Sequence, residues 1–446
     1  MDTAMVTSRP GEVVAMRRNR ILIRSVLLVQ SFMLATGAYG FEYDAQVRAG
    51  VGVSDNIART PQNEIDETIR TVGFDFGVTE QTNSLDLDIR SNFDFVEYAD
   101  DTFDSELVGG LNGAATITLV DERLRWVIED TFGQSLFDPF QPARPDNREN
   151  VNIFTTGPTL SLMPASRNPI ILDVRYSRMD FEIRPNDNDR LSGALSIGRE
   201  VSRESTLSLN LNATRIEYDN GGLTPPVEQY DAYLRFETTG NRSTLGIDLG
   251  YNEVEFAGSF GDGIIARADY TREASANGIF SVSGGSQYSE QGNIFGFIRD
   301  ATQDLTDTSD ITGSPAPFQN NFFVLSYALD QERYSIVTSV DWNQEDYEDG
   351  QGIDRDIFRG NLIFRREVTR TVFAGASLAF NRREFKDLER RDDDLTLGLD
   401  IGYQFTAGFD VSIEFQHFQR NSTTPGADFT ENRAFLRFSY TPVWSR

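Results

Sequence analysis

The sequence predicts an all-β fold: a closed transmembrane antiparallel β-barrel of about 20 strands (roughly 18–22) with a polar lumen. Three observations predict it. Apolar residues recur at every second position along most of the chain, short and long connections alternate, and an export segment precedes the first strand. Long loops are expected to be extracellular and short turns periplasmic, with both termini on the periplasmic side.

Residues 1–40 have the composition of a signal peptide. Four arginines form a basic region, an apolar stretch follows from Ser25 to Leu34, and Ala38-Tyr39-Gly40 has the small-x-small pattern of a cleavage site. The apolar stretch is too short to span a bilayer, and an uncleaved anchor is the alternative. Met16, directly before the basic run, is a second candidate start. We expect export through a cleaved signal peptide and one barrel domain over residues 41–446, integral to the bacterial outer membrane.

Strand-like alternation begins directly after this segment. From Glu42 to Val53, tyrosine, alanine and valine occupy the odd positions, whereas charged residues, glutamine and glycine occupy the even ones. The run from Leu395 to Phe405 has the same period of two. One face of each strand is therefore apolar and suits lipid. The other is polar and often charged, which suits a water-filled lumen better than the core of a β-sandwich.

The connections between the alternating runs are sorted by length. Short links are predicted at residues 79–84, 120–123, 164–168, 200–205, 238–242, 273–276, 329–332, 367–371 and 406–408. Long links are predicted at residues 54–67, 133–150, 181–189, 219–229, 287–319, 347–354, 384–392 and 419–431. Strict alternation of short and long links is typical of an outer-membrane barrel, whereas a soluble sandwich has no reason to show it.

Composition excludes several classes of function. The chain has no cysteine and a single histidine, His417, so disulfide scaffolds, thiol chemistry and two-histidine metal sites are excluded. We interpret His417 as a residue of the membrane interface, because no recognisable nucleophile motif lies near it. We therefore predict that the protein is not an enzyme. The formal net charge of −28 disfavours nucleic acid as a partner.

The expected outer loops are acidic, for example around residues 97–104 and 345–349. Calcium prefers oxygen ligands, but no calcium-loop motif is present, so solvated charge is the favoured interpretation and bound calcium the weaker alternative. No other cofactor is expected. The expected partners are outer-membrane lipid, lipopolysaccharide and the barrel assembly machinery.

Residues 287–319 form the longest predicted connection, and loops of this length in compact proteins are usually functional or disordered. Two arrangements are open. The loop either folds into the lumen as a pore constriction, with apolar residues on the wall and aspartates charging the passage, or lies outside the barrel. The candidate constriction residues are Ile294, Phe295, Phe297, Asp300 and Asp304.

Charged residues at inward-facing positions are the other candidate site. We expect arginines and aspartates to pair across neighbouring strands, which stiffens the wall and leaves a wet path. The acidic net charge predicts a preference for cations in a conducting pore. The candidate lumen charges are Asp86, Asp88, Arg90, Asp173, Arg175, Arg359, Arg365 and Arg437.

Two stretches of the chain resemble a known family. The first is Gly50 to Ile57, where Asp55-Asn56 follows the first strand, and the second comprises Trp126–Phe137 and Asn147–Ser161. They resemble the outer-membrane β-barrel family associated with exosortase and exopolysaccharide systems, described as β-barrel porin 2-like. The resemblance implies an outer-membrane location and a link to surface polysaccharide, and it supplies no catalytic residues.

The leading expectation is a channel-type barrel for the export or surface handling of exopolysaccharide, with polysaccharide export components as further partners. Two alternatives stay open. One is a general cation-selective porin, and the other is a structural or adhesion barrel whose lumen is occluded by arginine–aspartate networks.

Overall fold

The computed structural model describes residues 41–442, apart from residues 165, 291–313, 349–353 and 407. The predicted signal peptide lies outside the described residues. So do the five candidate constriction residues between Ile294 and Asp304.

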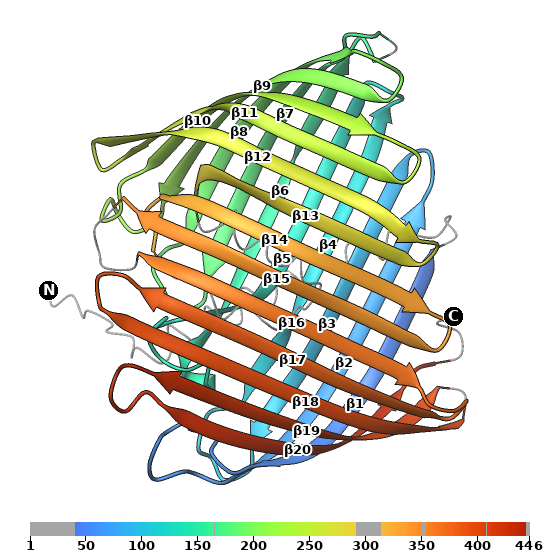
Figure 1. Cartoon of the computed structure of the whole chain (residues 1–446), viewed down its shortest axis with the longest axis vertical. Helices are drawn as coiled ribbons and strands as arrows, with labels where there is room; N and C mark the ends of the chain where they lie inside the picture. Colours follow the sequence, from blue (N-terminus) through green and yellow to red (C-terminus); the bar gives the residue numbers. More distant parts are fainter. Residues whose placement is uncertain (1–40, 165, 291–313, 349–353, 407, 443–446) are drawn as a thin grey trace, which may run out of the picture.

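The described residues form twenty antiparallel strands that close into one barrel (Figure 1). This confirms the predicted fold class and strand number. The strands are β1 (Glu42–Ser54), β2 (Glu67–Gln81), β3 (Leu85–Tyr98), β4 (Glu106–Val120), β5 (Leu124–Leu136), β6 (Arg148–Leu162), β7 (Ile170–Phe181), β8 (Asn188–Glu200), β9 (Ser205–Tyr218), β10 (Val227–Thr239), β11 (Ser243–Phe256), β12 (Ser259–Ser275), β13 (Gly278–Ser289), β14 (Phe318–Gln331), β15 (Tyr334–Tyr347), β16 (Arg355–Glu367), β17 (Val372–Phe385), β18 (Arg390–Thr406), β19 (Phe409–Ser422) and β20 (Phe429–Tyr440).

The barrel closes where the last strand lies beside the first. β20 pairs with β1 in register from Val47 opposite Tyr440 to Ser54 opposite Arg433 (Figure 1). Closure gives every one of the described strands a partner on both sides. The hydrocarbon interior of a membrane requires this, because it offers no hydrogen bonds to free backbone groups.

The two faces of the strands differ as the alternation predicts. On β1, Val47 and Val51 point outward and are about half exposed, and Leu399 and Ile401 on β18 do the same. The intervening side chains point into the lumen, where Arg48 of β1 meets acidic residues of β2 and β3. The outer face is therefore apolar and suited to lipid, and the inner face is polar.

The lengths of the connections confirm only in part the predicted alternation of short and long links. The turns on the side of the two termini have two to seven residues, and most links on the other, extracellular side are longer. Strict alternation is wrong, however. β11 and β12 are joined outside by Ala257 and Gly258 alone, both with positive φ, as a two-residue hairpin turn requires. The β17–β18 link has only four residues, because both strands continue through positions assigned to the loop.

Two apolar clusters of the described residues lie at the extracellular end of the barrel. One cluster joins the outer ends of β9–β11 to β13–β15, and a second joins β2, β3 and β20 to the first outer loop. The first cluster contains Ile216, Val227, Val254, Phe256, Tyr288, Ala316, Phe318 and Tyr347, and the second contains Ile57, Ile69, Tyr98 and Phe435. The extracellular half of the barrel is therefore partly filled, whereas the periplasmic half has a polar wall.

Candidate functional site

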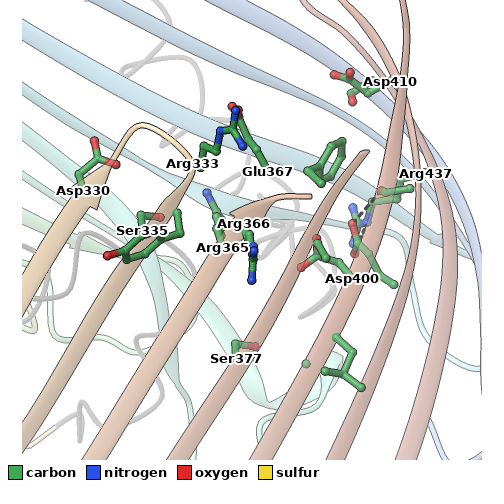
Figure 2. A pocket seen from close by; sticks show the side chains of 18 of the residues that line it. Asp330, Arg333, Ser335, Arg365, Arg366, Glu367, Ser377, Asp400, Asp410 and Arg437 are labelled. Atoms are coloured by element: carbon green, nitrogen blue, oxygen red, sulfur yellow. Dashed lines mark hydrogen bonds and ion pairs between the residues drawn. The ribbon is translucent and has the colours of Figure 1, made fainter. Parts of the chain in front are cut away.

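The inner wall formed by β16–β20 borders a large cavity in the periplasmic half of the barrel. This periplasmic cavity has a volume of about 960 Å³. Its wall carries both signs of charge. Arg365 on β16, Asp400 on β18 and Arg437 on β20 lie on this wall (Figure 2). Arg437 donates to Glu414 of β19 at 2.7 Å, so part of this charge is neutralised across strands.

A second cavity of about 490 Å³ lies above the first, towards the extracellular side. Ser377 and Gln416 line both cavities, so the two meet at a waist of small or uncharged polar residues. Five arginines line the upper cavity, and we call it the arginine chamber. They are Arg59 of the first outer loop, Arg148 of β6, Arg383 of β17, Arg420 of β19 and Arg433 of β20.

The loop between β5 and β6, residues 137–147, has a well-defined internal structure. Its last residues form the 3-10 helix η1 (Pro145–Asn147). Asn147 is the organising side chain: its Nδ2 donates to the carbonyls of Asp138 at 2.9 Å and Pro142 at 3.1 Å, and its Oδ1 accepts from the Asp138 amide at 2.8 Å. The side chain of Asp138 in turn accepts from the Phe140 amide. These bonds within the loop define its internal shape.

This loop crosses the mouth of the barrel. The ring of Phe140 packs on Phe385 of β17, with 4.9 Å between centroids, and Nη2 of Arg390 on β18 donates to the Phe140 carbonyl at 2.6 Å. By the shorter way round the barrel, β5 and β17 are eight strands apart. Nη1 of Arg59 donates to the Ala143 carbonyl at 2.9 Å, and Ala143 lines the arginine chamber. We call residues 137–147 the crossing loop. It narrows the lumen at the arginine chamber.

The Asp55-Asn56 motif fastens the first outer loop across the seam between β1 and β20. Oδ1 and Oδ2 of Asp55 accept from the backbone amide and Nδ2 of Asn432, both at 2.7 Å. Nδ2 of Asn56 donates to the carbonyls of Thr60 at 2.7 Å and Thr430 at 2.9 Å. The motif therefore closes the seam and sets the course of the loop that carries Arg59.

Arg59 enters the lumen from this loop and meets a buried carboxylate. Its Nε donates to Glu431 at 2.8 Å, while Arg433 donates to the same carboxylate at 2.5 Å and Ser54 Oγ at 2.6 Å. Burial lowers the pKa of Arg59 to about 10. Glu431 opposes this shift, whereas the charges of Arg433 and Arg148 add to it. Arg59 stays protonated at neutral pH, so it brings a positive charge into the chamber.

The strands that form the wall of both cavities match a known protein family. Residues 359–440 match the family model Putative beta-barrel porin 2. This match confirms the predicted resemblance, and it spans most of β16 and all of β17–β20. Together with the closed, lipid-facing barrel, it makes the chain a porin-like β-barrel integral to the outer membrane. No curated protein matches this sequence.

Several solved outer-membrane proteins are similar over most of the chain at low identity. The siderophore receptor PirA from Pseudomonas aeruginosa has 9% identity and a TM-score of 0.43, with 92% of this chain and 81% of that chain covered. The channel DcaP of Acinetobacter baumannii has 10% identity and a TM-score of 0.39, with 92% and 99% covered. OccAB4 of Acinetobacter baumannii has 7% identity and a TM-score of 0.37, with 92% and 100% covered.

Of the predicted lumen charges, Arg365 and Arg437 line the periplasmic cavity, and not all of the predicted residues pair across strands as expected. Arg359 pairs across strands with Asp341 of β15, and Arg437 with Glu414. Arg365 lies near Asp400 on the wall of the periplasmic cavity. Asp86, near the periplasmic end of β3, is exposed and lies opposite Gln81.

For two of the predicted arginines, the expectation of an aspartate partner on a neighbouring strand is wrong. Arg90 binds Asp88, and Arg175 binds Asp173, each two residues along the same strand. Residues two apart share a face, and an arginine side chain is long enough to bridge that spacing. Asp248 of β11 shows the cross-strand kind of pair, with Arg235 of β10 and Arg267 of β12.

Both described ends of the long loop between β13 and β14, which contains the candidate constriction residues, contact distant strands. Glu290, directly after β13, forms an ion pair with Arg190 on β8 and is buried. Pro315, shortly before β14, accepts from the Tyr218 hydroxyl of β9 at 2.9 Å. Each contact reaches five strands round the barrel. Both ends therefore turn towards the β8–β9 wall.

His417 and the acidic residues of the outer loops were the remaining candidates from the sequence. Nδ1 of His417 lies 2.8 Å from Oδ1 of Asn432, beside the seam contact of Asp55. Among the described residues, no group of three or more acidic or histidine side chains is placed to hold a metal ion. In the same part of the chain, no helix is long and apolar enough to cross a membrane.

Proposed function

We propose that this porin-like barrel is a non-enzymatic channel that carries exopolysaccharide, or fragments of it, across the outer membrane. The observation that carries the proposal is the pair of joined cavities along β16–β20, which the crossing loop narrows at the extracellular end. Where they meet, the wall presents hydroxyl and amide side chains such as Ser377 and Gln416. Such groups exchange hydrogen bonds with sugar hydroxyls at little cost relative to water.

The resemblance to exopolysaccharide-associated barrels supports the same solute class. We propose that the barrel assembly machinery inserts the chain, that its rim contacts lipopolysaccharide, and that polysaccharide export components are its functional partners. A general cation-selective porin is favoured only by the net charge of −28. The arginines of the upper chamber oppose it, because local charge at a constriction governs selectivity more directly than the average field.

A structural barrel with an occluded lumen is the candidate from another class. The crossing loop and the apolar clusters at the extracellular end are the observations that favour it. The two functions differ in whether sugars pass.

Swelling of proteoliposomes in neutral oligosaccharides of increasing length distinguishes the saccharide channel from the structural barrel. We expect swelling with short oligosaccharides and a sharp fall in rate as length increases, because solutes must pass the crossing loop. Vesicles without protein are the baseline. Proteoliposomes that swell no faster than this baseline with any sugar would contradict the proposed transport and leave the structural barrel.

A further inference from the structure

Among the residues that the structure describes, those of the arginine chamber carry more positive than negative charge, although the protein as a whole is strongly acidic. Five guanidinium groups line it, and the only carboxylate among its lining residues is Asp394. Two more carboxylates pair with the lining arginines: Glu431 with Arg59 and Arg433, and Glu106 with Arg148. Among the described residues, five guanidinium groups thus line the chamber or its edge and three carboxylates pair with them.

Arg383 and Arg420 share one carboxylate. Nε and Nη2 of Arg420 donate to the two oxygens of Asp394, at 2.6 Å and 2.8 Å, and Arg383 pairs with the same group. Both arginine side chains are almost completely buried. Nη1 of Arg420 has no hydrogen-bond partner in the described part of the chain. A buried N–H group of this kind is costly, and an anionic ligand would relieve the cost.

Aromatic rings hold several of these guanidinium groups in place. Arg59 lies 4.5 Å and Arg433 5.2 Å from the ring centroid of Phe418, and Arg420 lies 5.6 Å from that of Phe429. Contact with a ring face fixes the plane of a guanidinium group while its N–H edge stays available for hydrogen bonds. The arginines are therefore ordered before any ligand arrives, which lowers the entropic cost of binding.

The crossing loop forms one side of the same chamber. Gln134, Leu136 and Ala143, at the end of β5 and in the loop, line it opposite the arginines of β17, β19 and β20. A solute that passes the loop therefore comes close to the arginines in a confined space. Low local dielectric strengthens charge-assisted hydrogen bonds there.

We propose that the arginine chamber is a binding site for the carboxylate groups of acidic saccharides, such as uronic-acid oligomers. This inference rests on the proposed saccharide channel and names its substrate class. Guanidinium groups bind carboxylates through two parallel N–H···O bonds, and the uncharged waist below the chamber lets a bound oligomer continue towards the periplasmic cavity. The chamber therefore favours anions, although the net charge of the protein is negative.

The test measures block of single-channel current in planar bilayers by tetragalacturonate, with maltotetraose as the neutral sugar of equal length. We expect tetragalacturonate to block at far lower concentration than maltotetraose. Arg420→Gln should weaken the block by about tenfold, because it removes one charge-assisted contact and leaves Asp394 paired with Arg383. Arg148→Gln, in a half-buried position, is the second variant and should act in the same direction.

Arg215→Gln is the matched control. Arg215 lies on the outer surface of β9, is more than half exposed and pairs with Glu217 and Glu228, so its removal makes the same charge change away from the lumen. Folding of each variant is checked by heat-modifiable migration in gels. Equal block by the two sugars, or equal loss of block in Arg215→Gln, would overturn the acidic-saccharide site while leaving a neutral-sugar channel intact. Absence of both conductance and swelling would overturn the channel itself.

Discussion

Replacing residues 138–146 by a short glycine-serine linker raises single-channel conductance severalfold. The crossing loop extends from β5 to β17 and β18 and packs Phe140 against Phe385, so its removal clears the extracellular mouth. The remaining wall at this level is lined by β16–β20 and by the first outer loop. Conductance in planar bilayers is the readout, with the size limit for oligosaccharides in swelling assays as a second measure.

The control for this replacement is the same linker in place of residues 220–224. This segment belongs to the eight-residue loop between β9 and β10, and Leu223 in it is 86% exposed. We expect the control to keep the parent conductance. If the two replacements leave conductance equally unchanged, the crossing loop does not limit the passage.

Substituting Glu431→Ala destabilises the barrel by about 3–5 kcal/mol, because it leaves two guanidinium groups that are 10% and 18% exposed without their shared carboxylate. Glu431 is completely buried and accepts from Arg59, Arg433 and Ser54. These contacts join the first outer loop, β1 and β20, so their loss also loosens the seam. The midpoint of urea unfolding in lipid vesicles, followed by tryptophan fluorescence, measures the change.

Glu217→Ala provides the comparison for this substitution. Its side chain is 62% exposed and pairs with Arg215 at the surface, and such pairs contribute about 0–1 kcal/mol. We expect nearly parental stability for Glu217→Ala. Equal stability of the two variants would show that the buried pair does not hold the seam.

The barrel could be predicted from the sequence because its determinants are local. Alternation of side chains along a strand reports directly on which face meets lipid, as Val47 to Val53 on β1 illustrate. The number of strands follows from counting such runs. Exact link lengths were harder, because strands continue beyond the membrane through polar positions, as β17 and β18 do around residues 386–389.

The site was predicted less well, because it depends on contacts between distant segments. Length alone made residues 287–319 a candidate constriction, and the five candidate residues between Ile294 and Asp304 lie outside the described residues. The crossing loop at residues 137–147 was not among the candidates, and it is the structure that places it across the barrel mouth. Pro139, Pro142 and Pro145 around Phe140 were a usable signal, since prolines stiffen a loop and an isolated aromatic residue needs a surface to pack on. The sequence does not show that Phe140 packs on Phe385 of β17.

The arginine chamber was missed for a related reason. Arg383, Arg420 and Arg433 occupy ordinary inward positions in their own strands, and Arg59 lies in an outer loop. Only the seam contact of Asp55-Asn56 brings Arg59 to Glu431 and Arg433. The sequence resemblance located that motif, but its role depends on Asn432 of β20, which lies 377 residues further along the chain.

The most direct test of this account is a thiol cross-link between Phe140→Cys and Phe385→Cys, since the parent chain has no cysteine to interfere. The two rings lie 4.9 Å apart, so a short bismaleimide should join the positions within one chain in native membranes. The pair Phe140→Cys and Leu223→Cys is the control. We predict a cross-link, detected by mass spectrometry, in the first pair alone. A first pair that does not react, or a control pair that reacts equally well, would contradict a loop fixed across the barrel mouth.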